Sequence, residues 1–358
     1  MTLLQSSGCL IDEGAPVKSP PTKMKQEIAE IPTAVERLLT SGDADIKRIS
    51  SELRDSDLRC LLSVARGSSD HACTYLKYAA ELLLGLPMAS VGPSLASVYG
   101  ASLKADGMLC FSVSQSGKSP DITRMTRSLT KSGATTLAIT NHPGSPLSEA
   151  ASATVPIHAG PELSVAATKT FVTSLVAGLW LLAELKADTG LLAAIRNLSA
   201  HLEDAVACDW REAAPEKDIG SLFTLGRGPS WAVSNEASLK FKETCQLHAE
   251  SYSSAEVLHG PVSIVSHGFP VIVFAAADAA EQAVVDVADQ LSQMGASVFV
   301  NSEKAQRANV LPIVRTDHWL TDPIASIVSF YGLVEYVAGL QGINPDAPRH
   351  LNKVTETV

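Results

Sequence analysis

The stretch Leu62-Ser63-Val64-Ala65-Arg66-Gly67-Ser68-Ser69 decides the fold, because it is echoed by Phe223-Thr224-Leu225-Gly226-Arg227-Gly228-Pro229-Ser230. In each case an apolar run typical of a strand meets an Arg-Gly turn. The echo continues, since Gly133 lies 66 residues after the glycine of the first turn and Gly295 lies 67 residues after that of the second. Each of these later glycines is placed to end a helix before another strand. Two copies of one domain are therefore predicted.

Short apolar runs alternate with longer helical segments from residue 57 onward. This alternation is typical of a parallel sheet with helices on both faces. We therefore predict an α/β fold of two tandem domains, each a parallel sheet flanked by helices. The predicted segments are a flexible N-terminal tail (1–23), a first domain (24–195), a second domain (205–345) and a C-terminal tail (346–358).

Composition argues against several classes of protein. The chain has 358 residues, of which 46% are hydrophobic, and its formal net charge is −10. The hydrophobic content supports packed cores at this length, whereas the negative charge repels nucleic acid. The six cysteines form no C-x-x-C pair, which suits a reducing cytoplasm. We find no basic leader followed by an apolar run and no uninterrupted apolar span, so we expect a cytoplasmic protein without a membrane segment.

A loop rich in hydroxyl groups follows the strand expected at residues 108–113. It reads Ser114-Gln115-Ser116-Gly117-Lys118-Ser119-Pro120 and leads into a helical segment. Free backbone N–H groups, the helix dipole and short hydroxyl donors meet at such a place, so it is a natural cradle for an anion. An ordinary capped turn needs only one such donor, whereas Ser114, Gln115, Ser116 and Ser119 supply four. Ser69, in the first Arg-Gly turn, could lie beside the same ligand.

The second copy lacks this loop. After its corresponding strand, expected at 271–276, the chain continues Ala277-Asp278-Ala279, without hydroxyl groups or glycine. We therefore infer one phosphate site per chain, in the first copy. A nucleotide P-loop is disfavoured, because that motif needs a glycine five residues before Gly117 and position 112 is Ser112.

The helix expected after the second Arg-Gly turn carries Glu236, Lys240 and Glu243 on one face, because their spacings are four and three residues. One interpretation is a solvated stripe of surface salt bridges. The other is a carboxylate base beside a lysine, the pair needed to move a proton next to a carbonyl and to stabilise the enolate. The helix follows the carboxyl end of a strand, where open α/β sheets bind ligands, and this position favours the second interpretation.

Neither a metal nor an organic cofactor is predicted. His248-Ala249-Glu250 imitates the H-x-E of zinc deaminases, but no P-C-x-x-C follows it. His259 lies in an irregular segment, where an imidazole can titrate near neutral pH, although a lone histidine is more often structural. Lys353 lies in a polar C-terminal segment, and composition alone makes it merely solvated.

Together these segments resemble the sugar-isomerase (SIS) family, specifically the isomerase half of glutamine:fructose-6-phosphate amidotransferase and the free-standing glucosamine-6-phosphate deaminases. The resemblance extends from about Met24 to Val358. The segments that carry it are Met24–Pro32, Ser114–Gly117, Val165–Lys169, Lys240–Glu243, His248–Glu250, His259–Pro261 and Leu351–Thr355.

The resemblance implies a role for each matching residue. Glu243 would be the base that shuttles a proton between C1 and C2, and His259 the ring-opening group contributed across a homodimer interface. Lys240 and Lys353 would be lysines that face the ligand, with the C-terminal tail folded over the active site. Val165 would touch the sugar. The implied phosphate clamp consists of Ser69, Ser114, Gln115, Ser116 and Ser119.

One departure from the amidotransferases decides the expected reaction. Those enzymes begin with a glutaminase domain whose terminal cysteine attacks glutamine, whereas this sequence starts Met1-Thr2 and its Cys9 lies within the expected tail. We therefore expect release of ammonia, that is, a glucosamine-6-phosphate deaminase that forms fructose 6-phosphate. The alternatives are a deaminase or deglycase for galactosamine 6-phosphate or for an amine-linked fructose 6-phosphate, and a phosphosugar-sensing binding protein.

Overall fold

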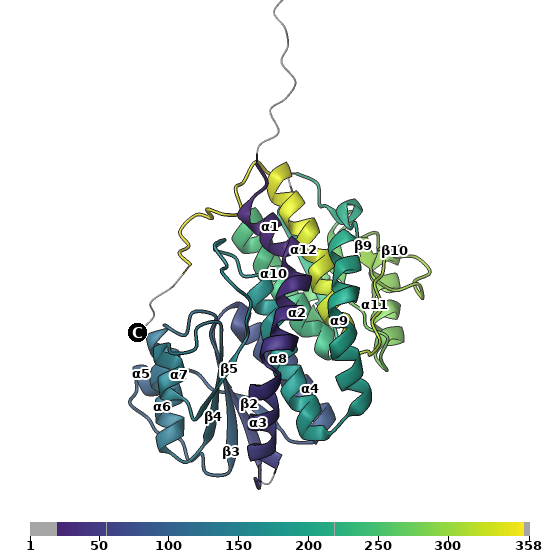
Figure 1. The fold of residues 1–358 in the computed structure, drawn as a ribbon. Coiled ribbons are helices and arrows are strands. Elements are labelled where there is room, and N and C mark those ends of the chain that lie inside the picture. The colour runs from purple at the N-terminus through teal and green to yellow at the C-terminus, as the bar shows by residue number, and fades with distance from the viewer. Residues whose placement is uncertain (1–19, 55, 218, 354–358) are drawn as a thin grey trace, which may run out of the picture.

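The computed structural model describes residues 20–54, 56–217 and 219–353. The predicted N-terminal tail up to residue 19 and the predicted C-terminal tail from residue 354 therefore lie outside the described residues. Two five-stranded sheets, both entirely parallel, form the framework, with the orders β2-β1-β3-β4-β5 and β10-β9-β8-β6-β7 (Figure 1). This arrangement confirms the predicted α/β fold with two parallel sheets.

The strands of the two sheets follow one another along the chain. The first sheet contains β1 Cys60–Val64, β2 Met88–Ser90, β3 Met108–Val113, β4 Thr135–Thr140 and β5 Ala153–Pro156. The second contains β6 Ser221–Gly226, β7 His248–Ser253, β8 Pro270–Val273, β9 Ser297–Val300 and β10 Asn309–Val310.

Helices cover both sheets and fill the space between them (Figure 1). The α-helices are α1 Lys23–Ala29, α2 Ile31–Ser41, α3 Asp43–Arg54, α4 Ser68–Leu84, α5 Ser94–Ser97, α6 Pro120–Lys131, α7 Pro146–Ala150, α8 Lys169–Lys186, α9 Thr189–Ala207, α10 Pro229–Cys245, α11 Glu281–Gln293 and α12 Asp322–Leu340. Short 3₁₀ turns lie at η1 Arg211–Ala213, η2 Glu256–His259 and η3 Pro261–Ile264.

The backbone repeats at the two Arg-Gly turns. Gly67, before α4, has φ 54° and ψ −135°, and Gly228, before α10, has φ 57° and ψ −134°. Glycine adopts this region because it lacks the Cβ that would clash there. The caps of α6 and α11, Ser119 and Ala280, are separated by the same 161 residues as the two glycines. The echoed turns and the two helix caps thus occupy corresponding positions in two related halves.

Strand β8 differs from the expectation, because it ends at Val273 and not at residue 276. The backbone N–H of Ala275 donates to the side-chain oxygen of Asn301 at 2.7 Å. This bond replaces a ladder bond to a neighbouring strand, so regular pairing stops earlier.

A single hydrophobic cluster joins the halves. It includes buried residues of α4, α8, α10 and α12, among them Leu76, Trp180, Phe241 and Phe330. Helices α4 and α10, which begin at the repeated turns, pack directly against each other. This contact brings the first turn of α4 next to the polar face of α10.

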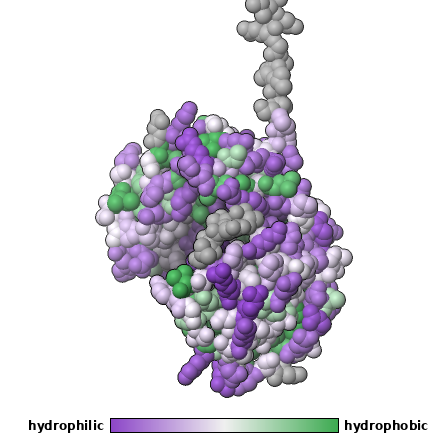
Figure 2. Space-filling model, turned by 90° about the vertical axis from the view of Figure 1, so that its left-hand side faces the viewer, coloured by the Kyte–Doolittle hydropathy of each residue, from purple (hydrophilic) through white to green (hydrophobic). Residues whose placement is uncertain are grey.

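Helix α12 is the one described helix long and apolar enough to span a membrane, but 72% of that stretch is buried inside the protein, as expected of a core helix. On the face shown in Figure 2, hydrophilic side chains predominate and hydrophobic ones form small separate groups. The apolar residues are therefore used mainly for internal packing.

Candidate active site

The hydroxyl-rich loop lies between β3 and α6, as predicted. The Ser114 hydroxyl accepts a hydrogen bond from the Gly117 N–H at 3.2 Å, and the Ser116 hydroxyl accepts one from the Lys118 N–H at 3.3 Å. The Ser119 side chain does not cap α6, and it is only half-buried. The loop therefore combines a helix N-terminus with a hydroxyl group that is available to a ligand.

Gly117 is required by the shape of this loop. Its φ is +62°, and a Cβ added there would lie 2.0 Å from the Ser145 hydroxyl oxygen. Any side chain at this position would push the loop away from α7, which Ser145 caps.

The face of α10 that carries Glu236, Lys240 and Glu243 points into the protein. The side chains of Glu236 and Lys240 are fully buried, and that of Glu243 is 22% exposed. The Lys240 ammonium lies 3.1 Å from Glu236 and 2.5 Å from Glu243, and it donates to the Ser68 hydroxyl at 3.0 Å. A solvated stripe is therefore wrong for this face, because two of its three charged side chains have no exposure to solvent. Burying ionised groups is costly, and such groups cluster at functional sites.

The buried groups hold one another in their charged forms. Burial alone would lower the pKa of Lys240, but the charges of Glu236 and Glu243 outweigh it and raise that pKa. Burial alone would raise the pKa of Glu236, but the Lys240 charge and the hydrogen bond from His71 outweigh it, so that pKa is lowered. At neutral pH Lys240 and Glu236 thus form a buried pair of an ammonium group and a carboxylate.

Tyr331 of α12 extends this polar cluster. Its hydroxyl is buried and has no hydrogen-bond partner among the described residues. Burial raises the pKa of Tyr331, and the charges of Glu236, Glu162 and Glu243 raise it further. Tyr331 is therefore a neutral phenol that is affected by the charges of α10 and of the loop that carries Glu162.

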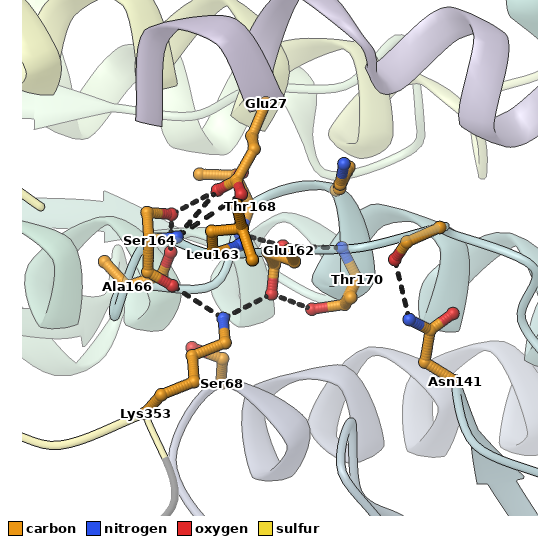
Figure 3. A network of polar contacts seen from close by, with 12 residues as sticks. Glu27, Ser68, Asn141, Glu162, Leu163, Ser164, Ala166, Thr168, Thr170 and Lys353 are labelled. Carbon is orange, nitrogen blue, oxygen red and sulfur yellow. Dashed lines mark hydrogen bonds and ion pairs between the residues drawn. The ribbon is translucent and has the colours of Figure 1, made fainter. Parts of the chain in front are cut away.

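The tail lysine is anchored in this region. The Lys353 ammonium donates to Glu162 at 2.8 Å and to the Ser164 carbonyl at 2.7 Å (Figure 3). Glu162 also accepts from the N–H groups of Thr168 and Thr170, at 3.0 and 3.1 Å. Val165 lies in the same loop and is half-buried. Lys353 is thus not merely solvated, contrary to what composition alone indicated.

The N-terminal helix supports the same loop. Glu27 of α1 is 4% exposed and accepts hydrogen bonds from the N–H groups of Leu163 and Ser164 and from the Ser164 hydroxyl (Figure 3). Asp346, in the segment after α12, accepts from the N–H of Met24 at 2.9 Å. Helix α1 therefore connects the tail to the loop that binds Lys353.

The cradle and this loop border a common cavity. Gln115 and Glu162 both line a pocket of about 510 Å³. Strand β3, which leads to the cradle, pairs with β1, which leads to α4 and Ser68. Ser69 is half-buried in the first turn of α4. The cradle and the first turn of α4 thus follow neighbouring strands at the carboxyl edge of the first sheet, and Lys240 of α10 contacts that turn. Lys353 is held by Glu162, which shares a pocket with Gln115 of the cradle.

His259 is not brought to this place within one chain. It ends the turn η2, is exposed, and makes no hydrogen bond or ion pair with the other candidate residues in the described part of the chain. The residues that our sequence reasoning missed are Glu27, Glu162, Tyr331 and His71. Their roles depend on contacts with residues far away in the sequence. Over the described ranges, no cluster of three or more His, Cys, Asp or Glu residues is arranged to hold a metal ion.

Comparisons with known proteins agree with the repeat. The SIS domain matches residues 53–184 and 217–320. The glutamine–fructose-6-phosphate aminotransferase (isomerizing) of Sulfolobus acidocaldarius is 31% identical over 343 residues, which cover 93% of this chain and 56% of that protein. The chain thus spans about half the length of the curated relatives it matches.

Solved structures extend the comparison. A protein of Silicibacter pomeroyi DSS-3, provisionally described as a phosphosugar isomerase, is 60% identical with a TM-score of 0.88, covering 91% of this chain and 100% of that one. The glucosamine-6-phosphate deaminase of Thermotoga maritima has a TM-score of 0.78 at 20% identity, covering 94% and 100% of the two chains. The second likeness concerns the fold alone.

Proposed function

Because the chain belongs to the SIS domain family, we propose that it is a phosphosugar isomerase whose reaction is the deamination of glucosamine 6-phosphate to fructose 6-phosphate and ammonia. The observation that carries this proposal is the buried ion cluster of α10, whose Lys240 contacts the first turn of α4. That turn follows β1, the strand that pairs with β3, and β3 leads into the hydroxyl-rich loop. A carboxylate held by a buried lysine, next to an anion cradle, suits proton transfer on a phosphorylated sugar. The 60% identity to a protein described as a phosphosugar isomerase supports the same class of reaction.

In this proposal the phosphate group binds at the N-terminus of α6. The N–H groups of that turn and the hydroxyls of Ser116 and Ser119 donate to the phosphate oxygens, with Ser114 holding the loop through Gly117. Ser69 and Gln115 approach from neighbouring strand ends, and Val165 contacts the sugar. Binding through the phosphate positions C1 and C2 for the following step.

Glu243 acts as the base. It takes the proton from C2 of the open-chain aldehyde and returns it to C1. The aldehyde oxygen gains a proton and the amino nitrogen loses one, which leaves a hydroxyl at C1 and an imine at C2. Water adds to this imine, and ammonia departs to give the ketone of fructose 6-phosphate. The Lys240 ammonium stabilises the negative charge that develops on the enolate-like intermediate.

The remaining two candidates complete the site. His259 is exposed at the end of η2, which suits a group donated to the active site of a second copy across a homodimer interface. There it would assist ring opening, since an imidazole exchanges protons near neutral pH. Lys353, held by Glu162, would close the tail over the sugar.

The direct test is ammonia release coupled to detection of fructose 6-phosphate. Glucosamine 6-phosphate and galactosamine 6-phosphate are offered separately to the purified protein, and binding of each is measured by calorimetry. We expect rapid release from the gluco substrate. Ammonia release from galactosamine 6-phosphate alone would show that the enzyme is specific for the other configuration at C4. Binding of the sugars without turnover of either would refute the proposal and support a phosphosugar sensor.

A further inference from the structure

A row of charged groups leads from Glu243 along one face of α10 to His71 of α4. Glu243 contacts Lys240, Lys240 contacts Glu236 at 3.1 Å, and the second oxygen of Glu236 lies 2.9 Å from Nδ1 of His71 on α4. We call these four residues, His71, Glu236, Lys240 and Glu243, the ionic row. The proposed mechanism uses Glu243 and Lys240 but assigns nothing to His71.

The ionic row is unbalanced without His71. Two carboxylates and one ammonium leave a net charge of −1, and both Glu236 and Lys240 are fully buried. A protonated His71 brings the net charge to zero. In a poorly solvated setting such groups do not titrate independently, so a proton on His71 changes how strongly Glu243 holds a proton.

The outer edge of His71 reaches solvent. Its side chain is 22% exposed, and it lines a pocket of about 380 Å³ together with residues of α10 and β7. Because the Glu236 carboxylate only accepts hydrogen bonds, Nδ1 carries hydrogen in both charge states, and Nε2 is the atom that gains or loses the proton. His71 can therefore exchange protons with water while contacting the buried row.

The other charged groups around His71 do not supply the positive charge that a protonated His71 brings to the ionic row. Lys242 of α10 and Glu250 of β7 line the outer pocket, where Glu250 accepts a hydrogen bond from Tyr252 at 2.6 Å. That bond raises the pKa of Tyr252 to about 12, so the phenol stays neutral. On α4 itself, burial raises the pKa of the neighbouring Asp70, while the charges of His71 and Arg66 oppose the rise.

We propose that His71 is a positioning residue that sets the proton affinity of Glu243 through the ionic row. The inference rests on the proposed function, because it assigns the proton transfer to Glu243. When His71 is neutral, the net negative charge of the row makes Glu243 a stronger base. When His71 is protonated, the added positive charge makes Glu243 a weaker one. Turnover therefore rises with pH as His71 loses its proton.

The first test compares the pH dependence of ammonia release in wild type, His71→Asn and His201→Asn. The asparagine amide can donate to Glu236 in place of Nδ1 but cannot titrate. His201 pairs with Asp317 at 3.2 Å outside the site, so its variant is the matched control.

Wild type should lose roughly threefold in turnover as His71 gains its proton, because the added positive charge makes Glu243 a weaker acceptor for the C2 proton. His71→Asn should lack this loss, so the ratio of its rate to that of wild type should rise at low pH. Titration of other groups, His259 among them, cancels in that ratio. A ratio that stays constant with pH would overturn the proposal, since a purely structural role lowers activity at every pH.

The second test needs no sugar. The ring protons of His71 are titrated by NMR in wild type, Glu236→Gln and Glu243→Gln, with the His201 resonance as the internal control. Each substitution removes negative charge, so the midpoint of the His71 titration should fall, on the order of half a pH unit for Glu243→Gln and more for Glu236→Gln. An unchanged His71 midpoint in Glu243→Gln would refute the coupling. If wild type releases ammonia from none of the sugars, the proposed function is refuted, but this NMR test of the coupling still applies.

Discussion

Replacing Lys240 with methionine tests whether the buried ion cluster holds the two halves of the protein together. Lys240→Met keeps a long, unbranched side chain but removes the ammonium that contacts Glu236, Glu243 and Ser68. Glu236 is fully buried, so it would keep a charge with no cation on its own helix. Removing one partner of such a pair costs about 3–5 kcal/mol of unfolding free energy.

The size of this effect has a matched control in the same protein. Asp43 and Lys47 of α3 have the same spacing of four residues as Glu236 and Lys240, at 2.9 Å, but their side chains are 34% and 59% exposed. Lys47→Met should cost less than about 1 kcal/mol, because water screens an exposed pair. The double variant Glu236→Gln, Lys240→Met should recover a large part of the loss, since it leaves no unpaired charge on Glu236.

The loss should also depend on pH in a defined direction. In wild type the lowered pKa of Glu236 stabilises the fold above the pKa of an unfolded glutamate, and this contribution disappears as pH falls through the lowered value. In Lys240→Met, burial raises the pKa of Glu236, so its carboxylate lowers the free energy of unfolding at neutral pH. This loss becomes smaller as Glu236 gains a proton at lower pH. Urea unfolding at pH 7.5 and pH 5, followed by tryptophan fluorescence, measures both effects. A loss below about 1 kcal/mol that is equal at the two pH values would refute this reasoning.

Two further predictions concern the cradle and the tail. Gly117→Ala should weaken phosphosugar binding at least about tenfold while the protein still folds, because the added Cβ must displace Ser145 and the loop with it. Calorimetry measures this affinity, and a variant that binds as tightly as wild type would contradict the prediction. Glu162→Gln should speed trypsin cleavage after Lys353 several-fold, because the lysine loses its ion pair with Glu162. Mass spectrometry follows the cleavage, and an unchanged rate would show that this ion pair does not hold the tail.

Local sequence patterns predicted the framework well. The two Arg-Gly turns have nearly identical backbone angles, and the strand expected at 108–113 is found at those residues. A turn that needs glycine and a run of apolar residues are both determined by near neighbours in the chain. The loop from Ser114 to Ser119 was recognisable for the same reason, since a strand end, a glycine and a helix start are local features.

The rest of the site depends on contacts that no local pattern reveals. Glu27 contacts Ser164 across 137 residues, and His71 contacts Glu236 across 165. Spacing placed the charged residues of α10 on one face but left open whether that face was buried, and only the packing of α4 against α10 decides it. The place of Lys353 was suggested by family resemblance, because its own neighbours are polar and uninformative.

The most direct test of the account is the turnover of Glu243→Gln with glucosamine 6-phosphate, measured together with its affinity for that sugar. Glutamine keeps the size of the side chain and its hydrogen-bonding reach but cannot accept the proton from C2. We predict at least about a hundredfold loss of turnover, the contribution typical of a general base, with an affinity within about threefold of wild type. A Glu243→Gln protein that turns over at the wild-type rate would contradict the central claim that this carboxylate moves the proton.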